Sequence, residues 1–321
     1  MNKLNVGFFS AKNYLDRMVF SGTLYKMHES LHSVPINLIN LGNPQVPKVL
    51  GISGKIWRKL KGSFLSQPPA KNAIAPQFRQ LIQEQLQHNS LDLILAPVAC
   101  QEMQYLETDI PIIYLSDVTH KLLVETYQLD YTQQKEECEA SRCCLLFIGR
   151  NWERKGGKLA FETLTSLLEM GVDAELLVIG CSPPPDYKHQ RLRVIPYLDK
   201  NIPEQREKFN HLLLKSHFLI FPTRADCSPI VICEANAYGI PVMTTDVGGI
   251  PTIIKEGKNG FMLSLSASGQ DYAELIKANF SDTNQYQNLV KSSRGEYDTR
   301  LNWQTWAERL YDIMLELTNV N

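Results

Sequence analysis

Short apolar segments alternate with segments of helical spacing along two separate stretches of this 321-residue chain. The apolar segments have the length and composition of buried strands, and they comprise residues 4–10, 34–41, 91–97 and 112–117 in the first stretch and 144–149, 174–180, 193–196, 217–222 and 241–245 in the second. Between them lie predicted helices at residues 22–31, 76–88, 158–170, 203–215 and 229–238. Strands that alternate with helices form parallel sheets, because a parallel pair needs a crossover connection. The sequence therefore predicts an α/β protein with two parallel sheets.

A change of composition separates the two stretches. Residues 130–142 are rich in Gln, Lys and Glu, and the strand–helix pattern restarts after them. We place the domain boundary there, with one Rossmann-like domain at residues 1–138 and a second at residues 139–300. A final amphipathic helix follows within residues 301–321. The chain length suits two domains of ordinary size.

The overall composition excludes several classes of function. Hydrophobic residues make up 44% and charged residues 21%, which is typical of a soluble globular protein. The net charge of -1 gives no general attraction to nucleic acid or anionic lipid. Seven cysteines without a CxxC pair or a neighbouring His cluster indicate reduced thiols and no metal site. No signal peptide or membrane-spanning apolar run is visible, so we expect a cytoplasmic protein that meets a membrane only at its surface.

The first candidate binding segment is residues 149–157, which follow a predicted strand and open a helix. Arg150, Arg154 and Lys155 place three cations at the carboxyl edge of the second sheet, where open parallel sheets bind ligands. Guanidinium and ammonium groups suit a diphosphate. The glycine pair that follows would let the backbone approach such a ligand closely. The alternative is a solvated basic turn.

The second candidate segment carries two carboxylates, Asp226 and Glu234, separated by seven residues. A helix is predicted to start near Ser228 or Pro229, and the free N–H groups at its start would form an anion site. Glu234 lies two turns into this helix, where it could accept hydrogen bonds from a ribose. The alternative role of Asp226 is to cap the helix, which is compatible with ligand binding.

A third segment contains Gly248 and Gly249 directly after a buried strand. The pair permits a tight loop beside a binding cleft at that edge of the sheet, and the alternative is a plain structural turn.

Taken in order, the three segments resemble family 4 glycosyltransferases of the GT-B fold, which belong to the glycosyl transferases group 1. The match covers roughly residues 143–265 and rests on the motifs Gly149-Arg150, Lys155-Gly156, Asp226…Glu234, Glu234-Ala235-Asn236-Ala237-Tyr238-Gly239-Ile240-Pro241-Val242, Gly248-Gly249 and Glu256-Gly257-Lys258-Asn259-Gly260.

The resemblance implies a role for each matching residue. Arg150 and Lys155 would bind the donor diphosphate and stabilise the leaving group. Asp226 would contact the hydroxyls of the donor sugar, and Glu234 would hold the ribose. Backbone amides would face the phosphates from the start of the helix, at Ser228, Pro229, Ile230 and Val231. Two departures stand out: the first acidic position is usually Glu and here is Asp, and Pro229 has no N–H to offer.

The N-terminal half resembles the family more weakly. Gly22, in Ser21-Gly22-Thr23, matches the family's glycine-containing loop near the donor phosphate, although Ser21 could instead act as a helix N-cap. The family often places a functional His after a strand, and here Asp117 or His120 is the candidate catalytic residue. The alternative for both is a structural role.

The implied protein is a retaining, metal-independent hexosyltransferase without a cofactor. Its donor would be a UDP-, GDP- or ADP-sugar, and its acceptor would be a sugar, a lipid-linked molecule or a small molecule. Both would bind in a central cleft between an N-terminal acceptor-side domain and a C-terminal donor domain. The final helix would cross back to the N-terminal domain. The basic, apolar residues 48–64 could contact anionic lipid or a lipid-linked acceptor, and the favoured alternative is a mobile acceptor loop.

Other classes stay open. A nucleotide-sugar epimerase would share the two-domain architecture, but no clear set of additional acid/base residues is visible. The Asp at position 226 and the altered His position leave room for a binding or regulatory protein related to transferases. A dinucleotide oxidoreductase is disfavoured because no GxGxxG follows either opening strand.

Overall fold

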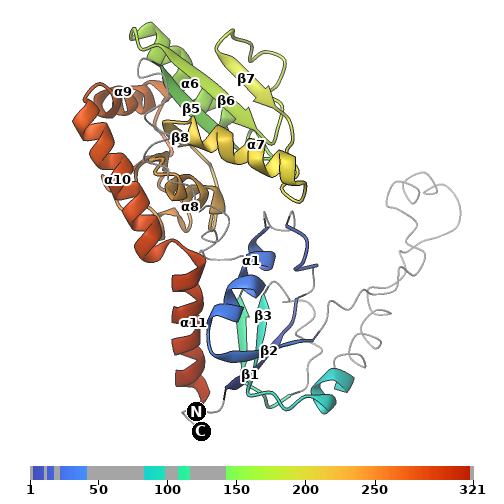
Figure 1. Ribbon diagram of the computed structural model, residues 1–321. Coiled ribbons are helices and arrows are strands. Elements are labelled where there is room, and N and C mark those ends of the chain that lie inside the picture. Colours follow the sequence, from blue (N-terminus) through green and yellow to red (C-terminus); the bar gives the residue numbers. More distant parts are fainter. Residues whose placement is uncertain are drawn as a thin grey trace, which may run out of the picture. The chain divides into compact units, whose positions relative to one another are not determined.

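The chain divides into two compact units in a computed structural model (Figure 1). The structure describes residues 3–10, 13–17, 22–41, 83–97, 108–115 and 142–318. The first unit comprises Met1–Leu15, Leu31–Ser116 and Tyr311–Asn321, and the second comprises Asp16–Ser30 and Asp117–Leu310. The predicted boundary between residues 138 and 139 lies outside the described residues, as does the segment 48–64.

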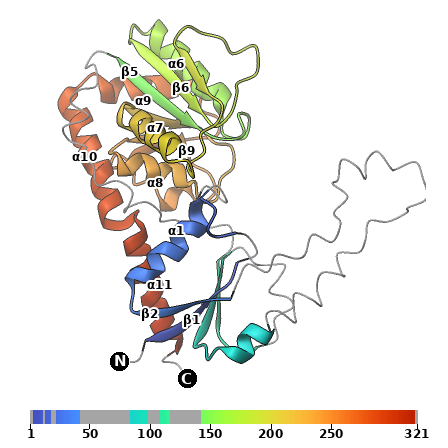
Figure 2. The same ribbon diagram turned by 45° about the vertical axis from the view of Figure 1, so that its right-hand side comes forward.

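The first unit contains a four-stranded parallel sheet with the strand order β2-β1-β3-β4. Its strands are β1 (Leu4–Phe8), β2 (Ile36–Asn40), β3 (Leu93–Pro97) and β4 (Ile112–Leu115). The central strand β3 is buried along its whole length, as expected of a parallel strand that is covered on both faces. Figure 2 shows β1 beside β2, which pair in register from Leu4 opposite Ile36. Residues 83–88 are helical, within the predicted helix 76–88.

The second unit contains a six-stranded parallel sheet with the strand order β10-β9-β8-β5-β6-β7. Its strands are β5 (Cys143–Ile148), β6 (Ala174–Ile179), β7 (Leu192–Ile195), β8 (Phe218–Phe221), β9 (Val242–Thr245) and β10 (Gly260–Leu263). The chain runs outward from β5 to β7, then returns to β8 on the other side of β5 and continues outward to β10. The strand order therefore reverses between β5 and β8, and such a switch point opens a crevice at the carboxyl ends of the two strands.

Helices cover both faces of the second sheet, and Figure 1 shows α6 and α7 on opposite faces. The helices of the structure are α1 (Thr23–Ser30), α6 (Gly157–Glu169), α7 (Pro203–Leu214), α8 (Ile230–Ala237), α9 (Gly269–Phe280), α10 (Thr283–Arg300) and α11 (Trp303–Thr318), with short 3-10 helices η2 (Leu31–Ser33) and η4 (Ile250–Thr252). Among the described residues, no helix combines the length and apolarity needed to cross a membrane.

Helices α6 and α9 share one apolar core with the strands. Leu164 of α6, Ile276 of α9 and Phe147 of β5 are fully buried members of this cluster. The two helices approach closely at Gly269, where a Cβ atom would lie 2.3 Å from Cβ of Glu162. Glycine at the start of α9 is therefore required by helix packing, and the Ser268–Asp271 capping box satisfies the backbone there.

The glycine pair at the start of α6 packs closely against protein, which by itself explains why both positions hold glycine. Gly156 has φ 79° and a Cβ atom there would lie 1.9 Å from the carbonyl oxygen of Pro222. A Cβ atom on Gly157 would lie 2.2 Å from the ring of Trp152. The pair holds the start of α6 against the residues that follow β8.

Replacing Gly156 by Ala should therefore destabilise the protein strongly. The left-handed backbone costs a non-glycine residue about 1–2 kcal/mol, and overpacking against a backbone carbonyl adds about 1–3 kcal/mol. We expect the free energy of unfolding, measured by urea titration, to fall by about 2–5 kcal/mol.

Gly171 provides a matched control, since it has φ 77° and open space around its Cα. Gly171→Ala should lose only the backbone contribution of about 1–2 kcal/mol. Equal losses for the two variants would contradict the packing role assigned to Gly156.

Candidate functional site

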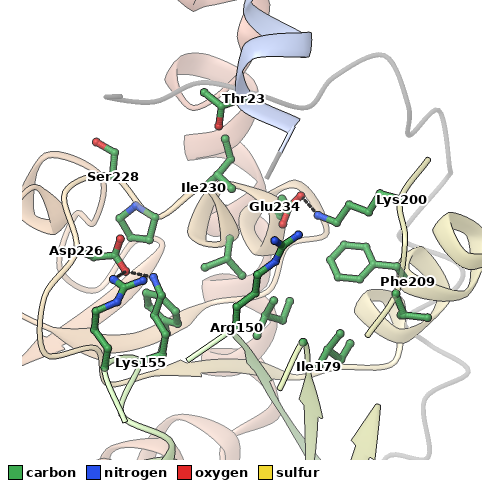
Figure 3. Close-up of a pocket in the computed structure, with 18 of the residues that line it drawn as sticks. Thr23, Arg150, Lys155, Ile179, Lys200, Phe209, Asp226, Ser228, Ile230 and Glu234 are labelled. Carbon is green, nitrogen blue, oxygen red and sulfur yellow. Dashed lines mark hydrogen bonds and ion pairs between the residues drawn. The ribbon is translucent and has the colours of Figure 1, made fainter. Parts of the chain in front are cut away.

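A cavity of about 600 Å³ lies at the carboxyl ends of β5, β6 and β8, at the switch point of the second sheet (Figure 3). Every residue that sequence analysis proposed for donor binding in the C-terminal half lines it, namely Arg150, Lys155, Asp226, Ser228, Pro229, Ile230, Val231 and Glu234. Arg154 lines it as well. Residues far apart in sequence therefore meet in one cavity, with cations and carboxylates on its wall.

Lys155 and Asp226 form an ion pair inside this cavity. Lys155 Nζ donates a hydrogen bond to Asp226 Oδ2, and both side chains are largely buried. The ammonium also lies 4.8 Å from the ring centroid of Phe221. Burial lowers the pKa of Lys155, an effect that Asp226 opposes and that the nearby Arg154 reinforces. The pair places one strong donor and one strong acceptor side by side.

Backbone contacts join the loop after β5 to the loop after β8. The carbonyl oxygen of Arg154 accepts a hydrogen bond from the Arg224 N–H at 2.8 Å and lies 3.1 Å from the Thr223 hydroxyl. The Arg154 guanidinium donates to the Ala225 carbonyl at 2.8 Å and lies 3.7 Å from Asp226. Half of the Arg154 side chain is exposed, so Arg154 mainly holds the two loops together.

The start of α8 forms a further part of the wall. The helix begins at Ile230 with Pro229 as its N-cap, so both residues named as its possible start precede the first helical residue. The N–H of Ile232 already bonds to the Pro229 carbonyl at 3.0 Å. The N–H groups of Ile230 and Val231 are therefore the candidate anion donors at this helix start.

Ser228 adds a side-chain hydroxyl to the same wall. Its Oγ atom is buried and has no hydrogen-bond partner among the described residues. A buried hydroxyl without a partner is costly, and an oxygen-rich ligand in the cavity would remove that cost. The position of Ser228 thus favours a phosphate or a sugar as the occupant.

Glu234 projects into the cavity from α8, and its side chain is 5% exposed. It pairs with Lys200, a residue of the turn after β7 that sequence analysis did not identify (Figure 3). The Lys200 ammonium lies 4.1 Å from the ring centroid of Phe209, which also lines the cavity. Lys200 could have been predicted as a site residue from its position just after the strand at residues 193–196. That strand ends at the same sheet edge as the strands that carry the other site residues.

The two glycines of the third candidate segment support the site from outside. Cβ atoms on Gly248 and Gly249 would lie 2.0 Å and 1.8 Å from the carbonyl oxygens of Asp226 and Cys227. The Gly249 N–H donates to the Asp226 carbonyl at 3.3 Å. These glycines set the backbone position of the acidic loop and do not line the cavity.

The N-terminal candidates fare differently. Gly22 adopts φ 87° directly before α1 and does not line the cavity. The cavity is lined instead by two residues near it, Arg17 and Thr23, which belong to the segment Asp16–Ser30 of the second unit. Asp117 and His120 lie outside the described residues, as does Ser21.

Comparisons with known proteins agree with this architecture. Residues 142–282 match the family described as Glycosyl transferases group 1. Spore coat protein SA of Bacillus subtilis (strain 168) is 27% identical over 193 residues, covering 53% of this chain and 48% of that protein. The putative colanic acid biosynthesis glycosyltransferase WcaL of Escherichia coli (strain K12) is 23% identical over 282 residues, covering 83% and 65%. The chain thus spans about half the length of the first of these relatives.

Solved structures share the fold. A glycosyltransferase from Rickettsia africae ESF-5 superimposes with a TM-score of 0.63 at 14% identity, over 98% of this chain and 99% of that one. The sucrose-phosphate synthase of Thermosynechococcus elongatus gives 0.57 at 14% identity, over 99% and 100%. The predicted α/β class, with two parallel sheets of the GT-B type, is confirmed.

Removal of the Asp226 carboxylate should expose the electrostatic cost of burying Lys155. In Asp226→Asn, burial acts unopposed and the pKa of Lys155 falls further. The unfolded chain then binds more protons than the folded protein between the lowered pKa and the ordinary pKa of lysine, so stability rises with pH through that window. We expect a loss of about 1–3 kcal/mol at pH 7 relative to the unsubstituted protein, which shrinks as the pH approaches 10.

Urea unfolding at several pH values between 7 and 10 measures this difference. Asp298→Asn is the control, because Asp298 pairs with Arg294 at an exposed site on α10. A difference between the unsubstituted protein and Asp226→Asn that stays constant across this pH range would show that Lys155 is not the group responsible.

Proposed function

We propose that this chain transfers a hexose from a nucleoside-diphosphate sugar to an acceptor, because residues 142–282 match the family described as Glycosyl transferases group 1. One observation carries the proposal: two cations, Arg150 and Lys155, share a cavity with the buried carboxylate of Glu234. Cations suit a diphosphate, and a buried carboxylate suits the hydroxyls of a ribose. A nucleoside diphosphate contains both groups, joined at a fixed spacing.

The chemistry follows from the charges that develop during transfer. The bond between the anomeric carbon and the diphosphate oxygen breaks, the acceptor oxygen bonds to that carbon and releases its proton, and negative charge grows on the departing phosphate. In our proposal Arg150, Lys155 and the amides at the start of α8 face that charge and stabilise it with little reorganisation, which their shared position on the cavity wall supports. The Ser228 hydroxyl is placed to donate one more hydrogen bond. In our proposal these groups supply the positive charge that a metal ion would otherwise supply, and transfer needs no cofactor.

Asp226 is proposed to hold the donor sugar. Its carboxylate lies beside Lys155, at the phosphate end of the site, where the hydroxyls of a donor sugar would follow the diphosphate. Retention of the anomeric configuration and assignment to the family 4 type rest on the resemblance of the motifs. The base of the donor is proposed to be uracil, guanine or adenine, and the acceptor to be a sugar, a lipid-linked molecule or a small molecule.

A thermal-shift panel of UDP-, GDP- and ADP-sugars tests the proposal. At least one donor should raise the melting temperature of the protein, and Lys155→Ala should weaken its binding by about 10- to 100-fold, which corresponds to one charge-assisted hydrogen bond. Lys158→Ala is the matched control, because Lys158 lies on the exposed surface of α6, outside the cavity. Unchanged donor affinity in Lys155→Ala would rule out the assigned phosphate site.

Turnover distinguishes the proposed transferase from the alternatives. A transferase releases the nucleoside diphosphate faster when an acceptor is present, and the anomeric configuration of the product, read by proton NMR, reports retention. An epimerase would change the donor sugar without an acceptor. A binding protein would shift its melting temperature with the donor and release nothing.

A further inference from the structure

We propose that Lys200 is a positioning residue that orients the Glu234 carboxylate toward the ribose hydroxyls of the donor, an inference that rests on the proposed function. Neither the family motifs nor the spacing of the acidic pair includes Lys200. The structure places its ammonium on Glu234 Oε1, at the opposite end of the cavity wall from the Lys155–Asp226 pair (Figure 3).

Glu234 needs a counter-charge because of where it lies. From Val231 to Ala237 every residue of α8 is buried, so the carboxylate stands in an apolar helix with little access to water. A buried ionised carboxylate is unfavourable unless it is paired and hydrogen-bonded. Lys200 provides the pairing, and Glu234 has no other hydrogen-bond or ion-pair partner among the described residues, so Oε2 is left as an acceptor on the cavity wall.

The turn that carries Lys200 is itself held in place. The Asp199 N–H donates to Gln205 Oε1 at 2.7 Å, and the Arg206 guanidinium donates to the Lys200 carbonyl at 3.3 Å. The ammonium lies over the Phe209 ring on the neighbouring helix α7. These contacts fix the cation before any ligand binds, and a fixed cation limits the carboxylate to one orientation.

That orientation has a consequence for recognition. With Oε1 engaged by Lys200, Oε2 is the more available acceptor for a ribose hydroxyl that enters the cavity. Without Lys200 the carboxylate can rotate, and a ribose hydroxyl loses an acceptor that is fixed in orientation. Lys200 would thus determine how strongly the site distinguishes a nucleotide with ribose hydroxyls from one without them.

The experiment compares a nucleoside diphosphate with its 2′,3′-dideoxy analogue by isothermal titration calorimetry. The base is the one chosen by the thermal-shift panel, and UDP, GDP and ADP are all tried if the panel selects none. In the unsubstituted protein the analogue should bind about 10- to 100-fold more weakly, since a hydrogen bond to a charged group is lost. In Lys200→Met the ratio of the two dissociation constants should fall to about 3-fold or less, because only the natural nucleotide loses affinity. Lys200→Arg should restore most of the original ratio.

Lys208→Met on the exposed surface of α7 is the control, and it should leave the ratio unchanged. If Lys200→Met weakens both nucleotides equally, Lys200 acts on the phosphates or on folding, and the inference is wrong while the proposed function stands. A ratio near one in the unsubstituted protein would also overturn it. If none of the nucleotides binds the unsubstituted protein, both the inference and the proposed function fail.

Discussion

The parallel pairing of β5 with β8 is the constraint on which the site depends. These strands are distant in sequence but adjacent in the sheet, so the loops that follow them emerge side by side at one edge. One loop carries Arg150 and Lys155 and the other carries Asp226 and leads into α8. Backbone hydrogen bonds between the loops then fix the spacing of the charges. Without this reversal of strand order, the cations and the acidic pair would have no common cavity.

The site has two electrostatic ends. At one end Lys155 is matched with Asp226, and at the other Lys200 is matched with Glu234. In each pair the lysine neutralises a largely buried carboxylate. A donor with a negative diphosphate and a hydroxyl-bearing ribose offers a partner to both ends. Arg150 has no ion-pair partner among the described residues, so it is the cation most directly available to an incoming phosphate.

Most of the charged residues on the cavity wall could be predicted from the sequence, because they lie in local motifs next to strand ends and in the first turns of helices. Strand β10 and helices α9 and α10 were not predicted. Strand β10 opens on a glycine and is mostly half-buried, and α10 is polar on most of its surface, so neither has a strong periodic signal. Lys200 was missed because its partner lies 34 residues away, and that contact exists only after β7 and α8 reach the same edge. Gly156 and Gly157 were assigned to ligand contact from the sequence. Glycine permits close approach of the backbone both to a ligand and to other parts of the protein, and the sequence alone does not distinguish the two.

The glycine loop behind the acidic segment limits how this part of the chain could be exchanged between related proteins. With no side chain on Gly248 or Gly249, the carbonyls of Asp226 and Cys227 rest directly on the backbone of the neighbouring loop. The acidic loop and the glycine loop therefore fit each other backbone to backbone. If the acidic loop alone were grafted into a relative, the relative's own second loop would not fit against it. Donor preference should transfer between homologues only when both loops move together.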